Sequence, residues 1–286
     1  MKDTPKKKKT VRRRIDDFVD KLEIIVFALF FLLGMYSFAD TYSVYSASQD
    51  TSLLTYKPAE GELLQPELTD NVAWLTLDDT TVDYPIMQGT NNDDYLDTDP
   101  YGNYSLSGSI FLDYRCSPNF EDTYNLVYGH HMEKGLMFGS LDDWLDEDYF
   151  NSHKTGTITT ANRIYSLQVV AVMEERATVN ELFQPTDVDP SKTLEFIKQN
   201  AVIYDDSVEL THVVALSTCK YPDTDDRTVV ICEMTLTYQG NNTELDQTKH
   251  QELQSSQTQV GTRIYSKVEP IEYKKDWIDW IAELFS

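Results

Sequence analysis

Two stretches, HVVALSTC from His212 to Cys219 and RTVVICEMTLTY from Arg227 to Tyr238, decide the fold of this chain. Both are rich in Val, Ile and Thr, which favour β-strands, so they predict strands at His212–Leu216 and Thr228–Tyr238. The residues between Cys219 and Arg227 include a proline and three aspartates, which are typical of a turn. If the two strands form a hairpin, Arg227 returns beside Cys219.

Six further runs of the same kind precede this pair, separated by turn residues. Helical signals are fewer: one lies at Phe138–Leu145 and another at Ser191–Ala201, which follows Pro190. Eight strands with so few helices predict a mainly-β fold, a closed or nearly closed eight-stranded barrel. The six earlier strands are expected at Val72–Leu77, Val82–Met87, Ser109–Asp113, Tyr124–Tyr128, Gly156–Thr160 and Ile164–Met173.

The charge of the chain is strongly asymmetric. The 286 residues have a formal net charge of −24, yet residues 1–14 hold eight basic residues and a single acid. The acidic remainder argues against nucleic-acid binding, which needs a basic surface, so we expect no nucleic-acid partner. A basic segment at the N-terminus instead predicts a membrane topology.

The stretch after this basic segment is apolar. Ile24–Ala39 contains sixteen residues without a charge, and extending it at both ends gives a transmembrane signal anchor at 22–43. The basic residues 1–21 then predict a cytoplasmic N-terminus and an extracellular body on a single-pass cell-membrane protein. A cleaved signal peptide is an alternative, since Ser37-Phe38-Ala39 resembles a cleavage site, and a buried core helix is another.

The rest of the chain divides into three parts. Residues 44–70 are polar, include Pro58 and Pro66, and are interpreted as a stalk with one short helix. The barrel is expected at 71–240. Residues 241–286 form a polar linker followed by an amphipathic helix that begins at Asp276, in which apolar residues recur at helical spacing.

Of the three cysteines, Cys219 is the candidate nucleophile. It is expected at a strand end that opens into a loop, where a thiol is accessible and firmly held. Cys232 lies inside a β-branched run and is expected to be a small buried residue, and Cys116 is interpreted as incidental. A nucleophilic thiol needs a base, which His130 or His131 at the end of a predicted strand could supply, and a donor for the oxyanion, which Arg227 could supply.

The other histidines are weaker candidates. His212 lies seven residues before Cys219, roughly 23 Å away along an extended strand. His153 and His250 lie in polar segments. The spacing of Cys and His does not match a zinc site, and nucleotide-binding loops are absent from the sequence, so no metal and no cofactor are expected.

Taken together, these residues resemble the sortases, specifically class B. The resemblance covers about Val72–Tyr238, and its motifs occur in the family's order. It is carried by Asp83–Gly89 (DYPIMQG) with Asn92–Leu96, Gly108–Asp113 (GSIFLD), Tyr128–Met132 (YGHHM) followed by Met137–Leu141 (MFGSL), and Leu216–Cys219 (LSTC) with Arg227.

The resemblance implies a cysteine transpeptidase on an eight-stranded barrel. Cys219 would attack the carbonyl of a Thr in the C-terminal sorting signal of an exported protein, and an amine acceptor would resolve the thioacyl-enzyme. His130 would act as acid and base because the family's histidine directly follows the glycine, and Arg227 would stabilise the oxyanion. Three further residues match positions that bind the signal peptide in relatives: Ser217, Asn92 and Leu96.

The acceptor stays open between two alternatives: a lipid-linked peptidoglycan precursor, or a pilin Lys as in class B pilin polymerases. A silent peptide-binding module and a hydrolytic cysteine protease are the rival functions. Two residues depart from the family pattern: Ala215 replaces a common Thr, and Lys220 replaces an acid found after the nucleophile in several class B members.

Overall fold

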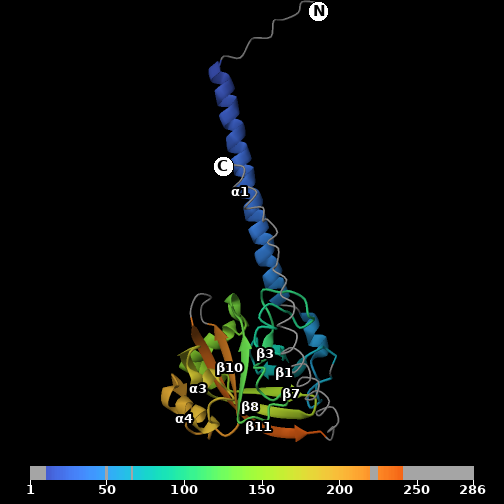
Figure 1. The fold of residues 1–286 in the computed structure, drawn as a ribbon, viewed down its shortest axis with the longest axis vertical. Helices are drawn as coiled ribbons and strands as arrows, with labels where there is room; N and C mark the ends of the chain where they lie inside the picture. The colour runs from blue at the N-terminus through green and yellow to red at the C-terminus, as the bar shows by residue number, and fades with distance from the viewer. Residues whose placement is uncertain (1–10, 49–50, 66, 220–224, 241–286) are drawn as a thin grey trace, which may run out of the picture.

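The computed structural model describes residues 11–48, 51–65, 67–219 and 225–240. Figure 1 shows a compact β-barrel body from which one long helix, α1 (Val11–Ser48), projects. The predicted C-terminal helix from Asp276, His250 and Lys220 lie outside the described residues.

Eight strands close the barrel, as the sequence predicts. Their order is β11-β10-β4-β3-β2-β1-β7-β8, and an antiparallel pairing of β8 with β11 completes the circle. Strands β2–β3 and β4–β10 pair in parallel, whereas the other neighbours are antiparallel; the short β9 (Ile203–Tyr204) extends the sheet beyond β8. The barrel strands are β1 (Asn71–Leu77), β2 (Asp83–Met87), β3 (Ile110–Leu112), β4 (Tyr124–Gly129), β7 (Thr155–Thr160), β8 (Arg163–Arg176), β10 (Val213–Cys219) and β11 (Asp226–Gln239).

Strand β10 is buried on both faces, which explains its uninterrupted apolar run. Val214 and Leu216 belong to the cluster inside the barrel, whereas Val213 and Ala215 belong to a second cluster on the outside. Residues of α3 (Asn180–Phe183) and α4 (Pro190–Asn200) complete this outer cluster, and both helices cover the same side of the barrel in Figure 1.

Helix α4 confirms the predicted helix at Ser191–Ala201. Pro190 occupies its first turn, where the missing N–H costs nothing. The side chain of Asp189 caps the helix by accepting a hydrogen bond from the Ser191 amide. The start of α4 therefore follows from local sequence.

The segment after β4 is more irregular than predicted. A two-stranded hairpin, β5 (His131–Met132) with β6 (Leu136–Met137), encloses the 3-10 turn η2 (Glu133–Gly135). The helix expected at Phe138–Leu145 is a 3-10 helix, η3 (Gly139–Leu145), followed by α2 (Glu147–Ser152). A Cβ at Gly139 would lie 1.9 Å from the Met132 carbonyl oxygen, so glycine allows η3 to begin against β5.

Helix α1 carries the apolar stretch found in the sequence. Among the described residues, one helix is long and apolar enough to cross a membrane: its window Phe18–Ala39 has 22 residues and a mean hydropathy of 2.2, with none of it buried against the protein. After α1 and the turn η1 (Thr51–Tyr56), Leu64 packs into the body and its amide donates to the Thr160 carbonyl over 3.1 Å. The segment predicted as a stalk thus contacts the body in both halves, since the Tyr45 hydroxyl also donates to Glu133 Oε2 over 3.1 Å.

Candidate active site

Strand register brings the proposed catalytic residues to one end of the barrel. In the β10–β11 hairpin, Cys219 is the register partner of Arg227, as predicted. In the parallel β10–β4 pair, Thr218 is the partner of Gly129. Because Cys219 and His130 directly follow these two partners, their backbones come next to each other at the ends of adjacent strands.

Gly129 permits this close arrangement. A Cβ there would lie 2.4 Å from Ile110 Cδ1 and 2.7 Å from Phe138 Cδ2, distances that side chains do not tolerate. The glycine before His130 therefore lets β4 pass between two buried apolar side chains.

A pocket of about 370 Å³ opens at this end of the barrel. It is lined by five of the six residues singled out in the sequence: His130, Arg227, Ser217, Asn92 and Leu96. The sixth, Cys219, follows Thr218, which also lines the pocket. Residues that are far apart in sequence thus meet at one cavity.

His130 is held at both its ring and its backbone. Its Nε2 lies 2.7 Å from the Leu96 carbonyl oxygen, and its own carbonyl accepts a hydrogen bond from the Phe138 amide over 3.0 Å. A carbonyl only accepts, so Nε2 carries the proton in this contact and Nδ1 is the basic atom of the neutral ring. Leu96, expected to contact substrate, thus also orients the histidine through its backbone.

Three other histidines make contacts away from the pocket. His131 Nε2 lies 3.0 Å from Asp142 Oδ2, and His212 Nε2 lies 2.7 Å from the Phe120 carbonyl oxygen. The His153 ring stacks on Tyr149. Within the described part of the chain, no group of three or more His, Cys, Asp and Glu side chains is arranged to hold a metal ion.

The two cysteines buried inside the fold, Cys116 and Cys232, are unreactive. Cys116 is 4% exposed and Cys232 is fully buried, and burial raises the pKa of each thiol to about 12. Both therefore stay protonated near neutral pH and inaccessible, as expected for residues without a catalytic role.

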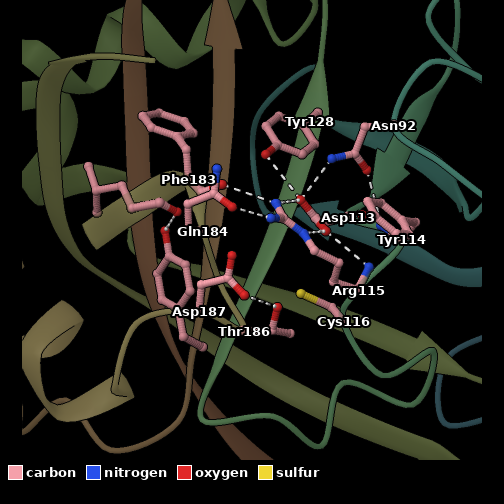
Figure 2. Close-up of polar contacts among 12 residues, drawn as sticks. Asn92, Asp113, Tyr114, Arg115, Cys116, Tyr128, Phe183, Gln184, Thr186 and Asp187 are labelled. Carbon is pink, nitrogen blue, oxygen red and sulfur yellow. Dashed lines mark hydrogen bonds and ion pairs between the residues drawn. The ribbon is translucent and has the colours of Figure 1, made fainter. Parts of the chain in front are cut away.

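A buried carboxylate beneath the pocket is a feature that sequence reasoning missed. Asp113 is fully buried, and Figure 2 shows it at the centre of a polar network. It accepts hydrogen bonds from Arg115 Nε (2.8 Å) and Nη2 (2.7 Å), from Asn92 Nδ2 (2.9 Å) and from the Tyr128 hydroxyl (3.2 Å). Burial alone would raise the pKa of Asp113, but the hydrogen bonds from Arg115 and Asn92 outweigh it, so the pKa lies below its usual value.

Arg115 carries this network to the opposite wall of the pocket. Its Nη1 donates to Gln184 Oε1 and its Nη2 donates to the Phe183 carbonyl oxygen over 3.0 Å (Figure 2). Arg115, Phe183 and Gln184 all line the pocket. The Arg115 side chain thereby joins the loop after β3 to the segment after α3.

The predicted peptide-binding residues divide into two kinds. The Asn92 side chain is engaged, since its amide contacts Asp113 and its Oδ1 accepts from the Tyr114 amide over 3.0 Å. The Ser217 hydroxyl, in contrast, is buried and has no hydrogen-bond partner within the described residues. A ligand in the pocket could satisfy Ser217, whereas Asn92 acts through the shape of the wall.

Comparison with known proteins identifies the family to which this chain belongs. Residues 75–235 match the sortase domain family. Since this match covers more than half of the chain, the protein belongs to the sortase family, a family of cysteine transpeptidases.

The relatives are class B members of that family. The chain is 35% identical to sortase B of Listeria monocytogenes over 164 residues, which are 54% of this chain and 65% of the Listeria protein, slightly less than two thirds of its length. It also matches a class B sortase of Streptococcus pyogenes involved in pilus biogenesis, with 36% identity, a TM-score of 0.54, and coverage of 66% of this chain and all of that one. A Staphylococcus aureus sortase B–substrate complex has 27% identity and a TM-score of 0.58, over 71% of this chain and 99% of that one.

Proposed function

We propose that this protein is a class B sortase transpeptidase that cleaves the sorting signal of an exported protein after Thr and transfers the new carboxyl end to an amine. The observation that supports this most directly is the strand register, in which Cys219 is the partner of Arg227 across the hairpin while His130 directly follows the end of β4, the neighbouring parallel strand. His130 and Arg227 line one pocket, and Cys219 follows Thr218, which lines it too, so the three residue types that acyl transfer requires are candidates for one site.

In the proposed reaction, the Cys219 thiolate attacks the Thr carbonyl carbon and a tetrahedral oxyanion forms. The C–N bond then breaks, and the imidazolium of His130 gives its proton to the leaving amine. An acceptor amine next attacks the thioester, neutral His130 takes up its proton, and the C–S bond breaks as the new amide forms. No redox step or cofactor is required.

The hydrogen bond from His130 to Leu96 supports a proposal for which ring atom transfers the proton. Because Nε2 donates to the Leu96 carbonyl, Nδ1 is the atom that we expect to exchange protons with the amines. The same bond keeps the imidazole from rotating between steps.

Arg227 is proposed to stabilise the oxyanion. Its guanidinium is permanently charged, lines the pocket, and lies on the strand that pairs with the one ending in Cys219. We propose that Ser217, Asn92 and Leu96 bind the sorting peptide, since all three line the same pocket, and that the Ser217 hydroxyl bonds a peptide group directly.

We also propose that α1 anchors the enzyme in the cell membrane. Its apolar window is long enough to span, and the basic residues before it favour a cytoplasmic N-terminus with the barrel outside. The division into a basic segment (1–21), an anchor (22–43), a stalk (44–70), the barrel (71–240) and a C-terminal extension (241–286) is part of this proposal.

The acceptor is proposed to be a lipid-linked peptidoglycan precursor, which would make the enzyme a cell-wall anchoring sortase. A second candidate is pilin polymerisation, in which a Lys side chain of another pilin subunit is the amine. It is favoured by the likeness to the S. pyogenes class B sortase involved in pilus biogenesis, all of which this chain covers.

Cleavage of peptides by the full chain in detergent micelles tests the mechanism. Quenched fluorescent peptides with varied residues around one Thr should be cleaved by the wild type, whereas Cys219→Ala should be inactive. Cys232→Ala, which alters a fully buried thiol, is the matched control and should keep most activity. Cleavage by Cys219→Ala would refute the nucleophile.

Mass spectrometry of the product then separates the two acceptors. A peptidoglycan fragment on the new carboxyl end supports wall anchoring, and a Lys isopeptide between subunits supports pilus assembly. If the only product is a free Thr carboxylate, even with both acceptors supplied, water resolves the thioester and the enzyme is a hydrolase.

A further inference from the structure

The residues that directly follow His130 and Arg227 in the sequence both bind one carboxylate, that of Asp142. His131 follows His130, and its Nε2 donates to Asp142 Oδ2 over 3.0 Å. Thr228 follows Arg227, and its hydroxyl donates to Asp142 Oδ1 over 2.6 Å. One side chain therefore joins the β-strand segments that carry His130 and Arg227.

This connection lies behind the pocket, not inside it. His130 and Arg227 line the pocket, whereas His131, Thr228 and Asp142 do not. Successive side chains of an extended strand point to opposite faces, which explains why each neighbour contacts Asp142 from the other side. Asp142 thus has no direct access to a substrate in the pocket.

The helix that carries Asp142 is firmly packed. In η3, Ser140, Leu141 and Trp144 are buried, and the Trp144 indole donates to the His153 carbonyl oxygen over 2.9 Å. At the start of η3, the Phe138 amide donates to the His130 carbonyl oxygen over 3.0 Å. Asp142 therefore projects from a rigid element that already contacts the His130 backbone.

The contacts of Asp142 differ in their surroundings. The Thr228 side chain is fully buried in β11, while the side chains of His131 and Asp142 are 27% and 32% exposed. Water can reach the carboxylate, so loss of one contact leaves Asp142 solvated and costs little folding free energy. Loss of a contact of Asp142 would instead remove the fixed spacing between the segments that carry His130 and Arg227.

We infer that Asp142 is a positioning residue that holds His130 and Arg227 at the separation acyl transfer requires, by binding His131 and Thr228. This inference rests on the proposed function, because it assigns the carboxylate a role in that reaction. A misplacement of about 1 Å in a reacting group can cost up to about a hundredfold in rate. Loss of the bridge should therefore lower kcat while KM stays nearly constant.

Two substitutions of Thr228 test the bridge in the full chain in micelles. Thr228→Val keeps the volume and β-branching but removes the hydroxyl, and we expect kcat to fall about tenfold with KM within twofold. Thr228→Ser keeps the hydroxyl and should retain most of the wild-type kcat. Thermal unfolding of both variants shows whether the fold is intact. Wild-type kcat in Thr228→Val, or an equal loss in Thr228→Ser, would overturn the inference.

A double mutant checks that Asp142 transmits the effect. In an Asp142→Ala background, Thr228→Val should cause no further loss, because the bond is already gone. His131→Gln, which keeps an N–H donor, should be milder than His131→Phe. If the fold-losses in kcat of the two single variants multiply in the double variant, Thr228 acts independently of Asp142. That result would contradict the bridge.

A readout that does not need turnover separates this inference from the proposed function. In ¹H–¹⁵N spectra of the imidazole rings, the His130 signal should shift or broaden in Thr228→Val and should stay in place in Thr228→Ser. If the wild type cleaves no peptide, the proposed function fails, and these spectra still decide the bridge. An unchanged His130 signal in Thr228→Val would reject it.

Discussion

Two carboxylates support the same pocket from different sides, and their surroundings differ. Asp113 is fully buried and accepts hydrogen bonds from three different residues, Arg115, Asn92 and Tyr128. The Asp142 side chain is 32% exposed and bonds to His131 and Thr228. The buried carboxylate, Asp113, shapes the walls that would hold a peptide, whereas the partly exposed one, Asp142, lies behind the residues proposed to do the chemistry.

The difference follows from the free energy of desolvation. A carboxylate and a guanidinium taken out of water are stable only while each has its partner, so loss of one exposes the cost of burying the other. A carboxylate in contact with water loses little when a partner is removed. We therefore expect Asp113 to govern stability and peptide binding, and Asp142 to govern rate.

The largest effect is expected from Asp113→Ala. The variant leaves the Arg115 guanidinium, whose side chain is 18% exposed, without its counter-charge, and should lower the free energy of unfolding by about 3–5 kcal/mol. Denaturant titration of the full chain in micelles measures this loss. Asp142→Ala is the matched control and should lose less, about 1–2 kcal/mol, because it leaves the buried Thr228 hydroxyl without its acceptor but no buried charge without a partner. Equal losses in the two variants would remove the contrast between the carboxylates.

Arg227→Ala should have the next largest effect, and on rate instead of stability. Removal of an oxyanion donor costs about 10²–10³ in kcat, and steady-state cleavage of a fluorescent peptide measures it. Arg227→Lys should recover little, because an ammonium lacks the fixed pair of donors. The control is Arg176→Ala: Arg176 follows Glu175, the register partner of Arg227 on β8, but does not line the pocket, and its side chain is 69% exposed. A near-wild-type kcat for Arg227→Ala would exclude its proposed role.

The sequence predicted the barrel well because each strand has a local signal. The apolar runs of β10 and β11 and the Pro190 that begins α4 identify their elements without reference to the rest of the fold. The strand-end positions of His130, Cys219 and Arg227 followed from the same runs. Their approach required the pairing of β4 with β10, for which the family resemblance, not the spacing, was informative.

The supporting network was not predictable in the same way. Asp113 bonds to Asn92, 21 residues earlier, and Arg115 bonds to Gln184, 69 residues later, so no periodic pattern relates them. Asp142 is likewise 86 residues from Thr228. Such contacts depend on how loops return to the barrel, which short-range propensities do not encode. The one local signal for this network was the spacing of Asp113 and Arg115, two residues apart directly after β3.

The smallest effect is expected at the far end of the Asp113 network, in the wall that Gln184 contributes to the pocket. Gln184 Oε1 accepts from Arg115, which leaves the amide N–H groups of Gln184 to bond a peptide in the pocket. Gln184→Ala should raise KM about fivefold with kcat within twofold, since one hydrogen bond is worth about 1 kcal/mol.

Gln184→Glu distinguishes binding from support of Arg115. The glutamate keeps an acceptor for the Arg115 guanidinium but has no N–H to give, so its KM should rise at least as much as in the Ala variant. Gln199→Ala, which removes an exposed contact with Glu195 on α4, is the control and should leave KM unchanged. A wild-type KM in Gln184→Glu would mean that this wall serves only to hold Arg115, and would confine peptide recognition to the side of the pocket that contains Ser217.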